Sequence, residues 1–169
     1  MGPVEPAVQY RLIDFTGLYE QHLRDLSAWV EKDIEPPTAT NYTVQNGQVY
    51  VPQYASQRAG IQPVANLEVR DGTVAEAQVG SPVTLQTGFE VSRGVGKIVS
   101  LEWDINGNGT FVLEDFGAPS LVAQTNIIHV YTEPGVYFPS IRVASHRSGD
   151  AESPYAVAYN LGRAKVVVK

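Results

Sequence analysis

The chain has 169 residues, of which 43% are hydrophobic and 18% charged, a composition typical of a folded globular protein. Its formal net charge of -6 disfavours nucleic acid as a partner, because contact with phosphates needs a concentrated positive surface. Cysteine is absent, which excludes disulfides, thiolate catalysis and zinc–thiolate sites. No stretch is long and apolar enough to cross a bilayer, so we expect no membrane span.

Near the start of the chain, apolar residues recur at helical spacing and predict one amphipathic helix over residues 17–33. Thr16 is a plausible N-cap, and Pro36 biases its predecessor away from helical backbone. The stripe on this helix consists of Leu18, His22, Leu23, Leu26, Trp29 and Val30. It needs a cover, which could be the rest of this chain, a second copy or a further domain.

A hairpin is predicted over residues 42–51, where two short β-rich runs flank Asn46-Gly47. A type I′ turn needs positive φ at both central residues, and Asn-Gly supplies it most readily. A two-stranded hairpin is marginal alone in water, so it too must dock. Residues 53–60 are expected to include one helical turn.

From Val64 onward the pattern is β throughout. We expect strands near 64–69, 83–91, 97–105, 110–113, 126–131, 136–146 and 155–168. About seven short strands over roughly a hundred residues predict a mainly-β chain with an immunoglobulin-like β-sandwich. The expected organisation is a helix and hairpin appendage over residues 1–60, which could be the tail of an upstream domain, followed by the sandwich over 61–169.

Two stretches carry a resemblance to a known family. Residues 99–109 contain Trp103-Asp104, and residues 129–137 contain His-x-Tyr-x-x-Pro-Gly-x-Tyr. Together they resemble the PKD (polycystic kidney disease) domain, and the resemblance covers about 64–169. The family has an aromatic residue after Trp-Asp, where this chain has Ile105. The resemblance implies a non-catalytic, secreted or cell-surface module for adhesion or spacing, whose partners are protein or carbohydrate surfaces. A Trp on a central strand also suits the space between two sheets.

A second resemblance covers residues 18–37, to the last helix of some secreted α/β-hydrolases. It is carried by the run from Leu26 to Pro37, because those enzymes have Leu-x-x-Trp-Val-Glu-x-Gly-x-x-Pro-Pro after the catalytic histidine. Asp33 stands where that pattern has glycine. This resemblance implies an alternative, the C-terminal part of an esterase-like hydrolase with its accessory PKD domain. The chain has no Gly-x-Ser-x-Gly elbow, so we expect no catalytic residues and no enzymatic activity in it.

Calcium is the one cofactor that the sequence suggests. Asp104, Asn106, Asn108 and Asp115 follow the spacing D-x-N-x-N-G-x5-D, which resembles a calcium loop with Asp in place of the usual last Glu. The alternative is a plain β-turn, because Asn and Gly tolerate left-handed backbone. The turn is favoured, since only two of the four ligands carry charge and no helices are expected beside the loop.

The three histidines do not form a triad by any visible pattern. His22 is expected to be a packed or partly exposed helix residue, His129 a structural hydrogen-bonding residue at a strand end, and His146 a solvated loop residue. The acidic residues of the front segment are expected on a solvated helix face. They are Asp14, Asp25, Glu31, Asp33 and Glu35.

Tyrosines offer a further binding hypothesis. A carbohydrate-binding strip could form from Tyr42, Tyr50 and Tyr54 in the hairpin region, or from Tyr155 and Tyr159 near the last strand. Packing is the favoured interpretation, since tyrosine in β-structure usually packs by its ring.

Overall fold

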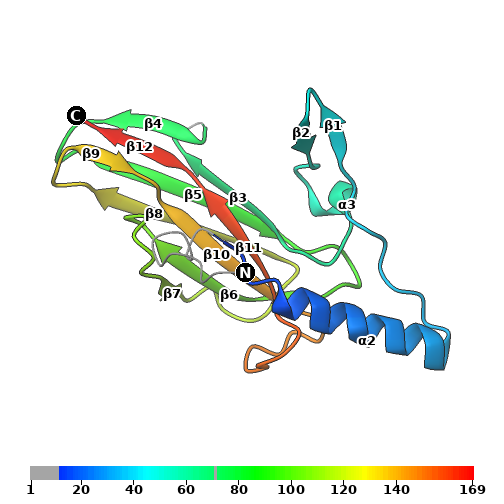
Figure 1. Ribbon diagram of the computed structural model, residues 1–169. Coiled ribbons are helices and arrows are strands. Elements are labelled where there is room, and N and C mark those ends of the chain that lie inside the picture. Colours follow the sequence, from blue (N-terminus) through cyan, green and yellow to red (C-terminus); the bar gives the residue numbers. More distant parts are fainter. Residues whose placement is uncertain (1–11, 71) are drawn as a thin grey trace, which may run out of the picture.

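The computed structural model describes residues 12–70 and 72–169; the first eleven residues of the expected appendage lie outside it. The appendage begins with helix α2 (Thr16–Lys32) and continues with the hairpin β1 (Thr43–Gln45) and β2 (Gln48–Tyr50). A single helical turn, α3 (Ala55–Arg58), follows. The expected helix, hairpin and turn are therefore all present (Figure 1). None of the described helices is long and apolar enough to span a membrane.

Helix α2 is capped differently from the prediction. Its N-cap residue is Phe15, not Thr16. The backbone N–H of Thr16 donates to Oδ1 of Asp14 at 2.9 Å, and this bond holds the pKa of Asp14 below its usual value. At the other end Asp33 has φ 57°, a left-handed conformation that closes the helix.

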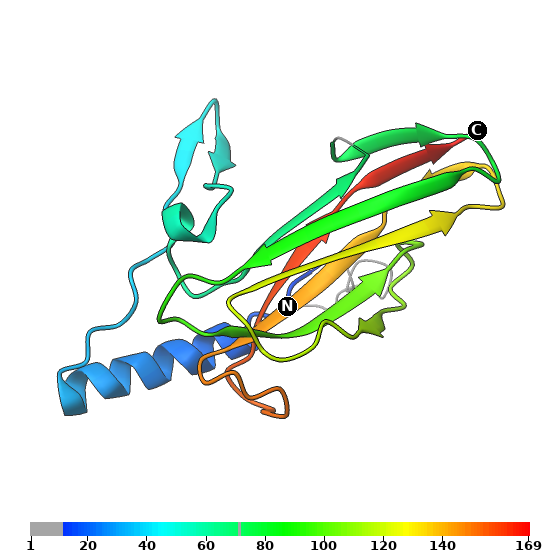
Figure 2. The same ribbon diagram turned by 180° about the vertical axis from the view of Figure 1, so that it is seen from behind.

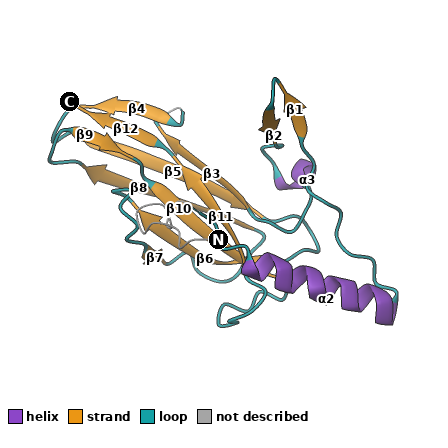
Figure 3. Cartoon of the chain, viewed as in Figure 1, coloured by secondary structure: helices purple, strands orange, loops and turns teal. Residues whose placement is uncertain are grey.

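The described residues after Ile61 form ten strands. They are β3 (Val64–Val69), β4 (Val74–Ala77), β5 (Pro82–Glu90), β6 (Lys97–Asp104), β7 (Val112–Glu114), β8 (Val122–Val130), β9 (Gly135–Tyr137), β10 (Ser140–His146), β11 (Ala158–Arg163) and β12 (Lys165–Val168). One layer has the order β3-β5-β8, and the other contains β4-β12-β9 and β11-β10-β6-β7. Because β9 leads into β10 and β11 into β12, the second layer is continuous (Figure 3). The mainly-β, immunoglobulin-like sandwich is thus confirmed.

Two of the predicted strands are each divided in the structure. The expected strand 136–146 is interrupted at Phe138-Pro139, since proline has no N–H to give to a ladder. The expected strand 155–168 starts only at Ala158 and breaks at Ala164. Strand β4 was not predicted; it is short and pairs in parallel with β12, from Val74↔Lys165 to Ala77↔Val168.

The core lies between the two layers, on the inward face of each strand. Along β5 the residues Val83, Leu85, Thr87 and Phe89 are buried, as their alternation predicts. Trp103 of β6 is only 3% exposed and belongs to the same cluster. Its neighbours in that cluster include Leu101, Ile141, Val143 and Val166.

The hairpin stands away from the sandwich (Figures 1 and 2). Asn46 and Gly47 have φ values of 50° and 75°, as the predicted type I′ turn requires. All six residues of the two strands are exposed. The base of the hairpin is closed by polar bonds, among them the Asn41 N–H to the Arg58 carbonyl at 2.7 Å and Arg58 Nε to the Pro52 carbonyl at 2.7 Å.

The two tryptophans allow a matched test of the core. Trp103→Ala removes a large buried side chain and leaves a cavity, so we expect it to lower the free energy of unfolding by about 3–5 kcal/mol. Trp29 is 49% exposed, and Trp29→Ala is expected to change that free energy by less than about 0.5 kcal/mol. Urea unfolding followed by far-ultraviolet circular dichroism measures both. Equal losses from the two variants would contradict this assignment of the core.

Candidate functional site

The two PKD-like segments meet at Tyr131. Its buried ring packs against those of Tyr137 and His129, with centroid distances of 4.2 and 4.6 Å. Its hydroxyl donates to the carbonyl of Ile105 at 3.0 Å, next to Trp103-Asp104. Burial raises the pKa of Tyr131 to about 12, so the hydroxyl stays a donor. The two segments therefore join by packing and one hydrogen bond.

His129 contributes packing to this cluster. Burial lowers the pKa of its imidazole, which favours the neutral form. Its ring lies edge-on to Tyr131, and its imidazole nitrogens form no hydrogen bond with any described residue, although its backbone is part of the β5–β8 ladder. The structural role expected for His129 is therefore met by ring contact, and the expected hydrogen bond is not formed.

The candidate calcium loop centres on Asp104, which is 1% exposed. Its Oδ1 accepts the backbone N–H of Asn108 at 3.1 Å and its Oδ2 that of Gly109 at 2.7 Å. Gly107 has φ 68°, and a Cβ there would lie 2.5 Å from the carbonyl oxygen of Phe138. This geometry satisfies a buried carboxylate by turning the loop back on itself.

The other three predicted ligands are exposed. Asn108 uses its Oδ1 to accept the backbone N–H of Thr110, and Asp115 uses its Oδ1 to accept that of Gly117. Asp104, Asn106 and Asn108 line one hollow, whose described lining does not include Asp115. In the part of the chain that the structure describes, no three His, Asp or Glu side chains gather to hold a metal. Calcium binding at this loop stays the less favoured hypothesis from the sequence.

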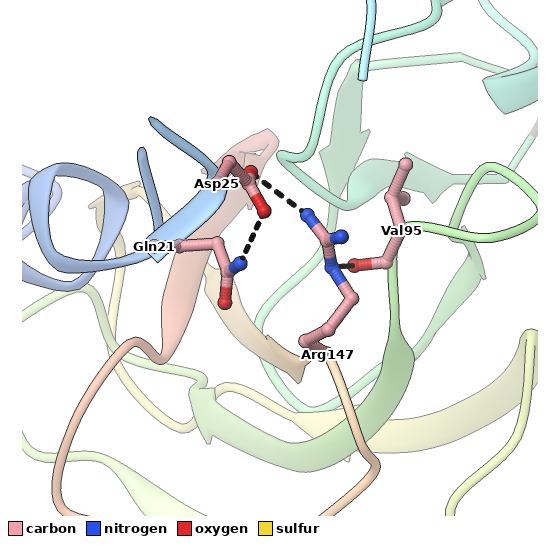
Figure 4. A network of polar contacts seen from close by, with 4 residues as sticks. All are labelled: Gln21, Asp25, Val95 and Arg147. Atoms are coloured by element: carbon pink, nitrogen blue, oxygen red, sulfur yellow. Dashed lines mark hydrogen bonds and ion pairs between the residues drawn. The ribbon is translucent and has the colours of Figure 1, made fainter. Parts of the chain in front are cut away.

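Helix α2 docks on the sandwich through polar side chains (Figure 4). Gln21 Nε2 donates to Oδ1 of Asp25 at 2.8 Å, and Arg147 donates to Oδ2 of the same carboxylate at 2.9 Å. Arg147 Nε donates to the carbonyl of Val95 at 3.0 Å. We call these four residues the α2 clamp.

Two further contacts hold the start of α2. The Glu20 carboxylate accepts the backbone N–H of Ala156 at 2.6 Å. Gly17 lies against Val157 so closely that a Cβ there would overlap the Val157 carbonyl. The buried residues of α2 are Gly17, Gln21 and Asp25. The expectation that Asp25 lies on a solvated face is therefore wrong, because a partner 122 residues away covers it.

The predicted apolar stripe of α2 faces away from the sandwich. Leu23 is 67% exposed, Leu26 51% and Val30 77%. His22 is exposed as well, and Leu18 is half-buried. The remainder of the described chain does not cover this stripe.

His146 is buried, contrary to the prediction of a solvated loop residue. Its Nδ1 accepts the backbone N–H of Asp150 at 3.2 Å and lies 3.2 Å from the hydroxyl of Ser148. Its Nε2 is buried with no partner among the described residues. The ring thus closes the turn after β10 through Nδ1, while Nε2 is buried away from solvent.

Of the first candidate tyrosine strip, Tyr42 and Tyr50 line one hollow and Tyr54 lines another. Tyr42 and Tyr50 are exposed on the hairpin, and Tyr155 is exposed after β10. Tyr159 is half-buried, with the Arg142 guanidinium 5.8 Å from its ring centroid. Tyr54 lines a polar hollow on the outer face of β3-β5-β8. Sequence reasoning missed this hollow, because its lining comes from three strands distant in the chain.

These features define an immunoglobulin-like β-sandwich module with a helical and hairpin appendage. No family model matches the chain, and no curated protein matches its sequence. Among solved structures, it is similar to the CARDB domain of a Pyrococcus furiosus protein crystallised in complex with di-metal ions. The identity is 16% over 64% of this chain and 96% of that chain, with a TM-score of 0.40. The PKD resemblance remains a prediction from the sequence.

The Asp104 loop predicts a response to calcium and to mutation. Because backbone N–H groups already engage both Asp104 oxygens, we expect the melting temperature to be the same in millimolar Ca²⁺ and in chelator. Asp104→Ala leaves those N–H groups without an acceptor and should lower the free energy of unfolding by about 1–3 kcal/mol. Thermal unfolding by calorimetry measures both. Stabilisation by Ca²⁺ that Asp104→Ala abolishes would show that the loop binds the ion.

The α2 clamp predicts local loosening on substitution. Arg147→Met leaves the buried Asp25 carboxylate without its cation, so we expect the α2 amides to exchange roughly tenfold faster or more. The sandwich amides should be unchanged. Lys169→Met is the control, because it breaks an exposed ion pair with Glu76. Hydrogen exchange read by mass spectrometry separates the outcomes; unchanged protection of α2 in Arg147→Met would show that the clamp does not hold the helix.

Proposed function

We propose that this chain is a non-catalytic, extracellular accessory module of the PKD type that docks through α2 onto a second folded domain. The observation that carries the proposal is the orientation of α2. An amphipathic surface helix ordinarily turns its apolar stripe to the core. Here Gln21 and Asp25 face the sandwich, while Leu23, Leu26 and Trp29 face solvent.

Exposed apolar side chains that gather on one element mark interaction surfaces in soluble proteins. The stripe of α2 continues past its end, where Ile34 is also exposed. Burying one such side chain contributes about 1.5–3 kcal/mol, so docking this face on an apolar groove would be strongly favourable. The hairpin supports the same conclusion, because Val44 and Val49 are exposed on a two-stranded sheet that is marginal alone.

The partner that we propose for α2 is a domain of the α/β-hydrolase type. The resemblance that suggests this partner covers Leu26 to Pro37. It includes three residues of the exposed stripe, Leu26, Trp29 and Val30. A further detail supports it. The hydrolase pattern has glycine at the position of Asp33, and Asp33 has φ 57°, the left-handed backbone that favours glycine at a helix C-terminus. The backbone at Asp33 therefore has the conformation that glycine adopts most readily.

A spacer role is compatible with the same geometry. Helix α2 lies at one end of the sandwich and Lys169 at the other (Figures 1 and 2). Partners attached at these two places would be held apart by the length of the sandwich. Adhesion to a protein or carbohydrate surface is the second candidate function, and the polar hollow beside Tyr54 favours it.

The docking face can be tested with a charged double variant. In the wild-type chain we expect the dye ANS to bind, and Leu26→Glu/Trp29→Glu to reduce its fluorescence severalfold without lowering the melting temperature. Val112→Glu/Leu113→Glu is the matched control, because these two apolar residues of β7 are even more exposed than Leu26 and Trp29. Light scattering after size exclusion should show a monomer. A dimer that the α2 variant dissociates would make a second copy the partner and contradict the proposal.

Two further outcomes bear on the same proposal. If the second domain belongs to the same polypeptide, the reading frame upstream of Met1 should encode a hydrolase-type domain with a Gly-x-Ser-x-Gly elbow. A reading frame that starts at Met1 would contradict docking within one polypeptide. Hydrolysis of p-nitrophenyl acetate by the isolated chain above the buffer rate would contradict the non-catalytic assignment.

A further inference from the structure

The outer face of the β3-β5-β8 layer carries an organised set of polar side chains. Residues that alternate with the buried ones point outward along each strand. The register places Gln86 of β5 beside Asn126 of β8 and Glu68 of β3, and it places Gly88 beside Gln124 and Asn66. Three neighbouring strands thus present four amides and a carboxylate around one glycine.

Gly88 has open space above it at the centre of this face. An ideal Cβ built on it has no atom within 4 Å, and its φ is not left-handed. The backbone therefore does not require glycine at this position, and glycine in a strand interior ordinarily weakens the strand. Gly88 is part of the lining of a hollow of about 490 Å³ on this face. We call this hollow the Gly88 groove.

Tyr54 forms one wall of the groove and is held there by polar bonds. Asn66 Nδ2 donates to the carbonyl of Gln53 at 3.3 Å, and the N–H of Ala55 donates to Glu90 at 2.9 Å. The residues before and after Tyr54 are therefore each bonded to the sheet. Tyr54 is 52% exposed. Its backbone is therefore held in place by the bonds of its neighbours, while its side chain is open to a ligand.

The chemistry of the lining defines the ligand. The amides of Gln86, Gln124 and Asn126 make no hydrogen bond with any described residue, and each amide can both donate and accept. That pairing matches a hydroxyl, which also does both. The described lining contains no Lys, Arg or His and includes Glu68 and Glu90, so an anionic ligand would be repelled. An aromatic face beside such amides suits the C–H face of a sugar ring.

We propose that the Gly88 groove binds a neutral oligosaccharide, with Tyr54 packing on a sugar ring and the three free amides bonding its hydroxyls. A basic peptide is the rival ligand. It is disfavoured because Glu90 already accepts the Ala55 N–H, which leaves Glu68 as the one carboxylate of the described lining without a hydrogen bond. The proposal rests on the second candidate function, adhesion to a carbohydrate, and gives it a site. It does not rest on the docking of α2, because the groove and the α2 stripe involve different residues.

The test is a titration of the ¹⁵N-labelled chain with cellohexaose, xylohexaose and mannohexaose at millimolar concentrations, followed by amide chemical shifts. At least one sugar is expected to shift amides of β5 and β8 around Gly88. Gly88→Val places a branched side chain, suited to strands, between Gln124 and Asn66 in the groove. It should therefore weaken binding by roughly tenfold or more, while the melting temperature stays equal or rises. Tyr54→Ala should weaken binding to a similar degree.

Matched controls lie close by. Thr84→Val changes the same strand four residues away, outside the described lining, and Tyr155→Ala removes an exposed tyrosine elsewhere; both should bind as wild type. The proposal is overturned if no sugar shifts these amides, if Gly88→Val binds as wild type, or if a (Gly-Lys)3 peptide fills the groove and the sugars do not. None of these results would alter the dye-binding outcome at α2.

Discussion

The ion pair between Asp25 and Arg147 decides which face of α2 meets the solvent. A buried carboxylate needs its cation and its hydrogen bonds, and removing either partner leaves an uncompensated charge. If α2 rolled to bury Leu26 against the sandwich, Asp25 would lose Arg147 and Arg147 would lose one of its two acceptors. The apolar stripe is therefore kept outward by polar contacts beneath it. The availability of that stripe for a partner follows from this constraint.

Local signals in the sequence predicted local structure well. Asn46-Gly47 predicted a hairpin turn because few residues other than Asn and Gly adopt positive φ without strain, and the alternation along β5 predicted its buried face. Strand β4 was missed, since its stability comes from pairing with β12 at the far end of the chain. The period of α2 was recognisable, but the face that docks depends on Arg147, and no helical periodicity contains that information.

The candidate sites also differ in how far the sequence alone could predict them. The predicted calcium ligands are close in sequence, and the structure places three of them around one hollow because a single turn carries them. The Gly88 groove needs the register of three strands, from Asn66 to Asn126, before its amides become neighbours. In the sequence these are single polar residues that alternate with apolar ones along each strand. A solvated face of the sheet explains that pattern as well as a binding site does. In the sequence Tyr54 is one of several candidate tyrosines. It differs from the others because Gln53 and Ala55, its chain neighbours, are hydrogen-bonded to the sheet.

The parallel pairing of β4 with β12 has a mechanical consequence. The last strand ends at Val168, and its four residues pair with β4 in register. A tension applied between α2 and Lys169 acts along β12, at right angles to the hydrogen bonds that join it to β4 and β9. Bonds loaded in this shear geometry must break together, whereas bonds at a peeled end break one by one. Pairs in this arrangement therefore resist extension more than pairs at a peeled end would.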